Sequence, residues 1–443
     1  MDEGQALAYA SQAVDRARKL GAEHAEATVS SVRRLHVEAR GEHLAKLEST
    51  TGKSLHVRVF TGGRKATLMT SDLAWDAVDS ALQRAIEQAA FVAPDPYAGL
   101  PELCASDRPE LALYDPALAQ REDAAKVQDA LALERLIRAY DPRITNSGGS
   151  HYGDAIAITA IANSAGFASA YTSTRASRST APLAQDGVVK RIAHYGTAAR
   201  ALAELDDVEL VARIAGSRAI EMFGARKPPT MRVPVIFERD VAAAVLDDLF
   251  TAISAASVAS GNSWATERIG ERIGGDLVTI VDDGRMPGLL GSSPFDGEGV
   301  ATRRTTVFDR GRLETFLYDS YYARKLGAQS TGNSTGGGIG ANSFYLEPGE
   351  ATLEALIAST ARGVLVLDTI GFATEHASGN YSRGARGFFI EGGELAYPID
   401  ECTIAGQFDQ MLAGIDAVAS DLRFDGSIVS PSFRVAEMTV SGT

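Results

Sequence analysis

The part of the sequence that decides the fold is residues 293–333, SPFDGEGVATRRTTVFDRGRLETFLYDSYYARKLGAQSTGN, followed by residues 379–399, GNYSRGARGFFIEGGELAYPI. Glycine recurs throughout both blocks, and their apolar runs are too short for long helices. This pattern predicts short strands joined by turns, with only brief helices between them. We therefore expect residues 229–443 to form a strand-rich α+β domain.

The N-terminal half carries longer periodic segments. Apolar residues at helical spacing predict several helices, and alternation of apolar and polar residues predicts strands. Residues 61–64, Thr-Gly-Gly-Arg, predict a hairpin turn, and Ser71-Asp72 predict the N-cap of the second helix. Pro228-Pro229 forbid helix continuation, and we place there the end of an N-terminal α/β domain, residues 1–228. The predicted helices are 3–20, 73–92, 117–140, 207–223 and 240–257, and the predicted strands are 35–40, 54–60, 65–71, several within 143–191, and 233–238.

Composition narrows the class of protein. The chain has 443 residues, of which 45% are apolar and 23% charged, and it carries a net charge of −14. An acidic chain without a basic cluster argues against nucleic-acid binding. No apolar run is long enough for a membrane span, and the acidic start is not a secretory signal. Two cysteines, Cys104 and Cys402, cannot form a disulfide framework, so we expect a cytoplasmic protein.

The two opening blocks and Thr403-Ile404-Ala405-Gly406 resemble the C-terminal half of the PmbA/TldE proteins. These belong to the TldD/PmbA family of peptide-processing metalloproteases. Weaker cues in residues 31–73 and in ITNSGG, residues 144–149, follow in the family's order. The resemblance implies a dimer interface and a peptide chamber in residues 229–443. It also implies a TldD-like partner chain or a second copy of this chain, and an unfolded peptide gripped through its backbone by strand addition.

The zinc site of the catalytic branch is missing from this sequence. An HExxxH helix needs two imidazoles one turn apart and a glutamate that activates the zinc-bound water. The matching helix, residues 240–257, contains Asp247 and Asp248 but no histidine, and residues 419–433 lack the cysteine ligand that the family supplies there. We therefore nominate no catalytic or metal-binding residue. The expected cofactor of this chain is none, with zinc in the TldD-like partner.

Candidate substrate-binding or interface residues come from the densest family-like blocks. They are Arg303, Arg304, Asn333, Tyr381 and Arg383. An arginine offers five donors to peptide carbonyls or to a partner carboxylate. Arg383 is alternatively a residue that ties its own glycine-rich loop together. The glycine-rich stretch 334–343 is not a P-loop, and it is either a flexible loop that lines the substrate site or a plain surface loop.

Three functions remain open. The first is a metal-free subunit of a TldD/TldE-type metalloprotease that degrades or matures unfolded peptides. The second is a stand-alone homodimeric peptide-binding or scaffold protein. The third, an independent hydrolase using Glu375, His376 and nearby serines, lacks the G-x-S-x-G motif. Asp247 and Asp248 diverge around the helix axis, and the histidines at 24, 36, 43, 56, 151 and 194 have no ligand spacing in the sequence.

Overall fold

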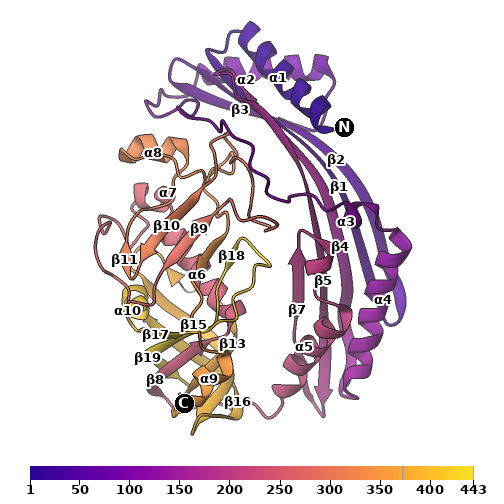
Figure 1. Cartoon of the computed structure of the whole chain (residues 1–443), viewed down its shortest axis with the longest axis vertical. Helices are drawn as coiled ribbons and strands as arrows, with labels where there is room; N and C mark the ends of the chain where they lie inside the picture. Colours follow the sequence, from indigo (N-terminus) through magenta and orange to yellow (C-terminus); the bar gives the residue numbers. More distant parts are fainter. Residues whose placement is uncertain (372–373, 443) are drawn as a thin grey trace.

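The computed structural model of the chain describes residues 1–371 and 374–442. As predicted, the protein is of the α+β class, with a large sheet in its N-terminal half and two further sheets in its C-terminal half. In Figure 1 the long N-terminal strands form an arch beside the C-terminal half, and the two chain ends lie at opposite ends of the molecule.

The N-terminal sheet has the strand order β3-β2-β1-β4-β5-β6, with β7 paired to β5, and all its pairs are antiparallel. Four of its strands are 17 to 20 residues long, so the strands predicted at 35–40 and 54–60 are parts of much longer ones. The strand predicted at 65–71 corresponds to a strand of seven residues, Arg64–Thr70. The strands are β1 His24–Arg40, β2 His43–Thr61, β3 Arg64–Thr70, β4 Ile144–Asn163, β5 Ala168–Asp186, β6 Val189–Ile192 and β7 Tyr195–Ala199.

Helices cover one face of this sheet. Alternate residues of β1, such as Ala27, Val29, Leu35 and Val37, are fully buried on that face. The first two pack near α1 and α2, and the last two pack near α4. Figure 1 shows these helices on the outside of the arch, so the other face of the sheet looks toward the C-terminal half. The helices are α1 Glu3–Lys19, α2 Trp75–Ala89, α3 Pro116–Gln120, α4 Asp123–Tyr140, the 3-10 helix η1 Leu202–Glu204 and α5 Val208–Glu221.

The C-terminal half contains two sheets with α6 packed between them. One sheet has the order β11-β10-β9-β12-β18. In the other, β13-β8-β19-β16-β15 pair in sequence, and β15 pairs back to β13, so these five strands close a ring; β14 and β17 are attached at its side. Apolar residues of α6, including Leu246 and Phe250, lie in the largest buried core with residues of both sheets.

The C-terminal strands are β8 Met231–Phe237, β9 Ile280–Asp283, β10 Arg304–Asp309, β11 Arg312–Leu313, β12 Phe344–Leu346, β13 Arg362–Ile370, β14 Thr374–Glu375, β15 Asn380–Glu391, β16 Glu394–Gln407, β17 Ile415–Val418, β18 Ile428–Val429 and β19 Phe433–Ser441. The helices are α6 Arg239–Ile253, α7 Ala255–Ala259, α8 Ser320–Leu326, α9 Leu353–Ala358 and α10 Phe408–Ala413. In the part of the chain that the structure describes, no helix is long and apolar enough to cross a membrane.

Of the two local features predicted from the sequence, the hairpin turn is present and the helix N-cap is not. The hairpin at residues 61–64 is confirmed, since Thr61 pairs with Arg64 and both glycines have positive φ, as this turn requires. The predicted N-cap of α2 is wrong, because Ala74 occupies that position and the Asp72 side chain accepts a hydrogen bond from the Ala74 amide.

Two predicted helices are each divided in two. The helix predicted at 117–140 is interrupted at Arg121, whose backbone is extended and whose guanidinium binds Asp129. The helix predicted at 240–257 is interrupted at Ser254. There the backbone groups of Ile253 and Ala255 bond to Leu317 instead of continuing the helical ladder.

Candidate functional site: a cleft between the arched sheet and a glycine-rich loop

A cleft of about 530 Å³ lies between the N-terminal sheet and the C-terminal half. One wall is the inner face of the sheet, and its lining is mostly polar there. It is made by Thr28, Ser30, Ser54, His56, Met69, Thr159, Ile161 and Tyr171. The other wall comes from two segments of the C-terminal half. The first segment contributes Ser293, Phe295, Asp296 and Gly297, and the second contributes residues 333–337 and 340–342 of the glycine-rich loop. The cleft therefore joins segments from both halves of the chain.

The edge of the N-terminal sheet borders this cleft. Met69 belongs to β3, which pairs with β2 on one side and ends the sheet within the described part of the chain. An edge strand presents backbone N–H and C=O groups that another extended chain can pair with. The cleft thus lies beside a strand edge suited to strand addition.

Asp282 on β9 clamps the base of the glycine-rich loop. Its side chain accepts hydrogen bonds from Asn333 Nδ2 at 2.8 Å, from Asn342 Nδ2 at 2.9 Å and from the Asn342 amide at 2.9 Å. Burial raises the pKa of Asp282 to about 6. The predicted site residue Asn333 therefore lies at the loop base, with its amide nitrogen engaged inside the chain.

Asp296 clamps the same loop from the other side. One carboxylate oxygen accepts from the Ser334 amide at 2.9 Å, and the other accepts from the amides of Glu298 and Val300. Burial, together with the Glu298 carboxylate, raises the pKa of Asp296 to about 7. Between its two clamps the loop carries Gly336, Gly337 and Gly338, and a Cβ added to either of the last two would meet no atom within 4 Å.

A buried ion triad connects the halves next to the cleft. Arg58 on β2 donates to Glu298 at 2.9 Å and to Glu26 on β1 at 2.5 Å. All three side chains are at most 9% exposed. The pKa of Glu26 is raised to about 7, because burial outweighs the opposing effect of Arg58. This triad holds the polar wall of the sheet against the loop-bearing half.

The predicted site residues other than Asn333 lie away from this cleft. Arg303 is exposed beside a smaller cavity of about 120 Å³, and its side chain makes no hydrogen bond or ion pair with the described residues, although its backbone carbonyl accepts a hydrogen bond from the Gly284 amide. Arg304 donates to Tyr345 and Glu347.

Tyr381 and Arg383 lie two residues apart on β15, with the Arg383 guanidinium 5.8 Å from the centre of the Tyr381 ring. Tyr381 is 2% exposed and packs edge-on against Phe237 and Phe408, so it belongs to the core. Arg383 donates to Asp248 on α6 and to the Gly371 carbonyl. The structure thus brings Tyr381 and Arg383 together but does not join them to Asn333 or to the two other arginines.

The Glu375–His376 region has a different arrangement from a hydrolase site. Ser378 Oγ donates to Glu375 at 2.7 Å, and Asn380 donates to the same carboxylate. Among the residues with described positions, His376 makes no side-chain hydrogen bond to a serine, and its Nδ1 is buried without a partner. A nucleophilic serine needs such a base within hydrogen-bond reach.

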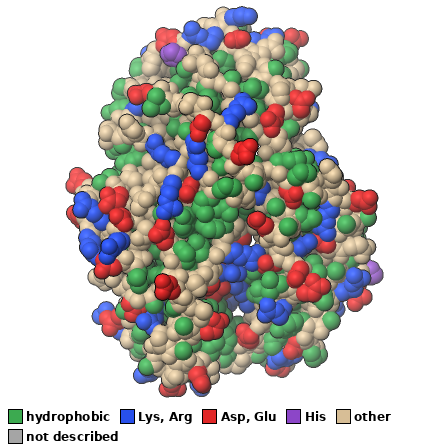
Figure 2. Space-filling view, viewed as in Figure 1, with side chains coloured by type: hydrophobic (Ala, Val, Ile, Leu, Met, Phe, Trp, Pro, Cys, Tyr) green, Lys and Arg blue, Asp and Glu red, His purple; other side chains and the backbone are tan. Residues whose placement is uncertain are grey.

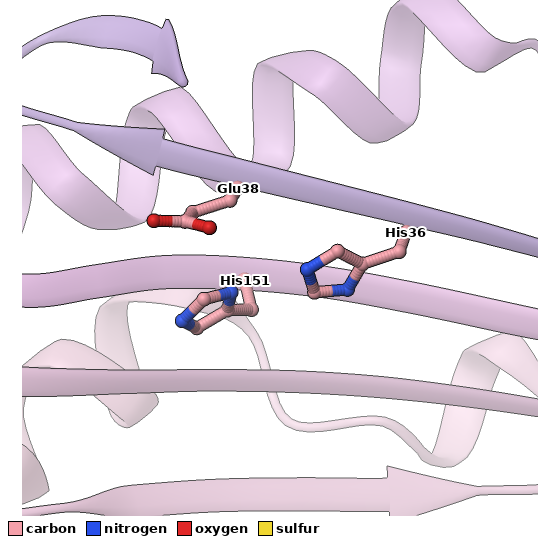
Figure 3. A group of neighbouring side chains, drawn as sticks. All are labelled: His36, Glu38 and His151. Carbon is pink, nitrogen blue, oxygen red and sulfur yellow. The ribbon is translucent and has the colours of Figure 1, made fainter. Parts of the chain in front are cut away.

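One cluster was missed by the analysis of the sequence. His36 and Glu38 of β1 lie beside His151 of β4, with one possible ligand atom of each residue within 4.8 Å of the others (Figure 3). The histidines are far apart in sequence, so no local spacing connects them. One pattern in the sequence could have indicated part of this cluster. His36 and Glu38 are two residues apart in a predicted strand, so their side chains lie on the same face.

Side chains of both charges occur on the face drawn in Figure 2. In Figure 2 lysine and arginine side chains lie interspersed with aspartate and glutamate side chains over this face, rather than in one basic area. The electrostatic footprint of a nucleic-acid site would be a continuous basic patch.

This chain is similar to proteins of a known family along most of its length. Three consecutive domains of the PmbA/TldA metallopeptidases match this chain: domain 1 at residues 25–93, the central domain at 116–223 and the C-terminal domain at 230–442. The chain belongs to the PmbA/TldD family.

Similar proteins cover nearly the whole chain. The metalloprotease PmbA homolog of Haemophilus influenzae is 33% identical over 99% of this chain and 96% of its own length. Metalloprotease PmbA of Escherichia coli O157:H7 is 32% identical over 94% and 92%. A Bacteroides thetaiotaomicron crystal structure, provisionally described as a modulator of DNA gyrase, superposes with a TM-score of 0.93 at 25% identity over both entire chains. TldE of Thermococcus kodakarensis, at 23% identity and a TM-score of 0.88 over 97% of this chain and 99% of its own, shares the fold.

Proposed function

We propose that this chain is the subunit without the catalytic zinc site in a TldD/TldE-type metalloprotease of the cytoplasm. In this proposal it holds unfolded peptides in the cleft and completes the peptide chamber of a zinc-bearing, TldD-like partner. The observation that carries the proposal is that α6 has no residue free to bind zinc in the manner of the catalytic branch. This helix has no histidine, and Asp248, where a metal ligand would be sought, is bound instead to Arg383 and Thr374.

The cleft supports the peptide-binding part of the proposal. Its sheet wall offers hydroxyl groups from Thr28, Ser30 and Ser54, and the edge of β3 lies beside it. A peptide that pairs with an edge through its backbone is bound with little regard to its sequence. The proposal therefore includes a broad class of unfolded peptides and no single sequence motif.

The partner part rests on family relatives and on one exposed side chain. A TldD homolog of Buchnera aphidicola, described as a metalloprotease, is 26% identical over 41% of this chain. Arg303 is exposed, and within the described structure its guanidinium has no hydrogen-bonding partner. It is available to a carboxylate or carbonyl of another chain.

The test uses the full chain, a TldD-like HExxxH chain and a labelled casein fragment as the unfolded peptide. We expect no cleavage by this chain alone with added zinc, and chelator-sensitive cleavage when both chains are mixed. We also expect native mass spectrometry to give a one-to-one complex. Zinc-dependent cleavage by the isolated chain would overturn the proposal.

The second candidate, a stand-alone homodimeric peptide-binding protein, is favoured by the cleft as well, because the cleft needs no partner to exist. The same experiment separates the two. A homodimer that binds the casein fragment but neither pairs with the TldD-like chain nor changes its activity would favour this candidate.

A further inference from the structure

Three ligand-type side chains converge on the inner face of the N-terminal sheet. Along β1, His36 and Glu38 are two residues apart and project to the same face. The antiparallel register places Glu38 opposite His151 of β4 and His36 opposite Gly153. The rings of His36 and His151 stack with their centroids 5.4 Å apart. Figure 3 shows the three side chains gathered over these neighbouring strands.

These three side chains lack other partners. Each is half-buried, and none makes a hydrogen bond or an ion pair with the residues the structure describes. His151 Nδ1 is fully buried and unpartnered. Buried polar groups in proteins are nearly always satisfied by protein, water or a ligand. The buried Nδ1 of His151 thus lies without a partner among the described residues, beside a half-buried carboxylate and a second half-buried imidazole that could bind the same cation.

Gly149 leaves space beside the cluster. Gly149 has a φ of +113°, and a Cβ there would lie 3.2 Å from both Glu38 Oε1 and His151 Nε2. Any larger residue would press on both of these atoms.

The donor set matches a particular class of cation. Two imidazoles and one carboxylate are a ligand set of zinc, and three protein ligands leave a position for water. Around a tetrahedral zinc ion such atoms are roughly 3.4 Å apart, so the present spread of up to 4.8 Å closes with small side-chain rotations. Lys46, the cationic neighbour across the strand pair from Glu38, is held 2.6 Å from Glu48, so its charge is already paired.

We propose that His36, Glu38 and His151 form a binding site for a zinc-class divalent cation that joins β1 to β4. This site is separate from the zinc site of the family's catalytic branch, whose place would be α6. It lies six residues along β1 from Ser30, roughly 20 Å from the cleft at the rise of an extended strand. The cation therefore stabilises the arch and does not act on peptide in the cleft. The proposal departs from the expectation that this chain binds no metal.

The test uses the untagged full chain, stripped of metal by a chelator and titrated with zinc sulfate in a calorimeter. We expect one zinc per chain with micromolar or tighter affinity, and a rise in the thermal midpoint on zinc addition. In His151→Ala and in Glu38→Gln we expect at least a tenfold loss of affinity and no rise in the midpoint. His376→Ala is the matched control, because it removes a histidine with a buried, unpartnered Nδ1 elsewhere, and it should bind zinc as the unchanged chain does.

Cobalt(II) supplies a second readout, since a protein-bound cobalt ion absorbs visible light according to its ligands. The band should appear in the unchanged chain and vanish in Glu38→Gln, the mildest of these substitutions, if His151→Ala does not fold. The inference is overturned if the unchanged chain binds no zinc, or if binding survives in both variants. Because no partner chain or peptide is present, this result is independent of the proposed function.

Discussion

Arg383 on β15 and Asp248 on α6 form a two-oxygen ion pair, with Arg383 Nη2 2.9 Å from Oδ1 and 2.7 Å from Oδ2 of Asp248. Both side chains are largely shielded from solvent, with 15% and 12% of their side-chain area exposed. Thr374 donates to the same carboxylate at 2.9 Å. The Asp248 carboxylate is thus engaged by bonds within the chain, and Arg383 ties β15 to α6.

The first prediction concerns this ion pair. Arg383→Ala should lower the free energy of unfolding by about 1–3 kcal/mol, because it leaves a partly buried carboxylate with fewer donors. Chemical denaturation of Arg383→Ala, Asp248→Ala and the double variant should give a double variant no less stable than Arg383→Ala alone. If Arg383→Ala keeps its stability but loses association with the TldD-like chain, the arginine acts across an interface instead.

The second prediction concerns the Glu375–His376 region. Glu375→Ala and His376→Ala should leave peptide cleavage by the reconstituted two-chain complex within about threefold, because substitutions away from the core and from the reacting groups usually shift stability by at most ~0.5 kcal/mol. Glu375 is exposed and bonds only local residues among those described. Initial rates with the casein fragment measure this effect. A hundredfold fall in turnover at unchanged stability would favour the independent hydrolase.

The third prediction is a pH dependence of stability. The pKa of Glu26 is raised to about 7 in the folded chain, whereas an unperturbed glutamate titrates near 4.3. Between these values the folded state holds a proton that the unfolded state has released. The contribution of Glu26 is therefore fully present below the unfolded pKa and is lost as the pH rises through about 7.

Glu26→Gln keeps an acceptor for Arg58 and removes this titration. Relative to the unchanged chain, the variant should gain about 1–3 kcal/mol of unfolding free energy when the pH is raised from 5 to 7.5. Urea denaturation of both proteins at the two pH values measures the difference. Identical pH profiles would show that Glu26 stays ionised throughout, held by Arg58.

The fourth prediction concerns the cleft. Ser30→Trp should fill part of the space between the sheet and the glycine-rich loop, because Ser30 lines the cleft. We expect at least a tenfold weaker affinity for the casein fragment, which corresponds to about 1.4 kcal/mol. Arg33→Trp is the matched control, since Arg33 is exposed on the same strand, does not line the cleft and projects to the other face. Fluorescence anisotropy of a labelled fragment compares the two, and equal affinities would place the peptide elsewhere.

The sequence by itself determined the α+β class, the order of most elements and the hairpin at Gly62-Gly63. These features depend on short-range physics: periodic burial marks helices and strands, and positive φ at two adjacent positions selects glycine. The absence of a histidine pair on α6 was equally legible, because ligands one helical turn apart are a local pattern.

Other features were decided only by the tertiary structure. The exposed run of β2 shows no alternation, so its 19-residue length depends on pairing with β1. The helix predicted at 240–257 ends early because the backbone around Ser254 bonds to Leu317, more than sixty residues away. Such contacts leave no mark in a local window.

The site residues divide in the same way. Sequence similarity pointed to Asn333 and Arg383, but their actual partners, Asp282 and Asp248, follow from how distant strands and helices pack. The meeting of His36 with His151 depends on the register of β1 against β4. A shift of one residue would turn His151 to the opposite face of the sheet, and that register is fixed by the burial of whole strands rather than by the residues of the cluster.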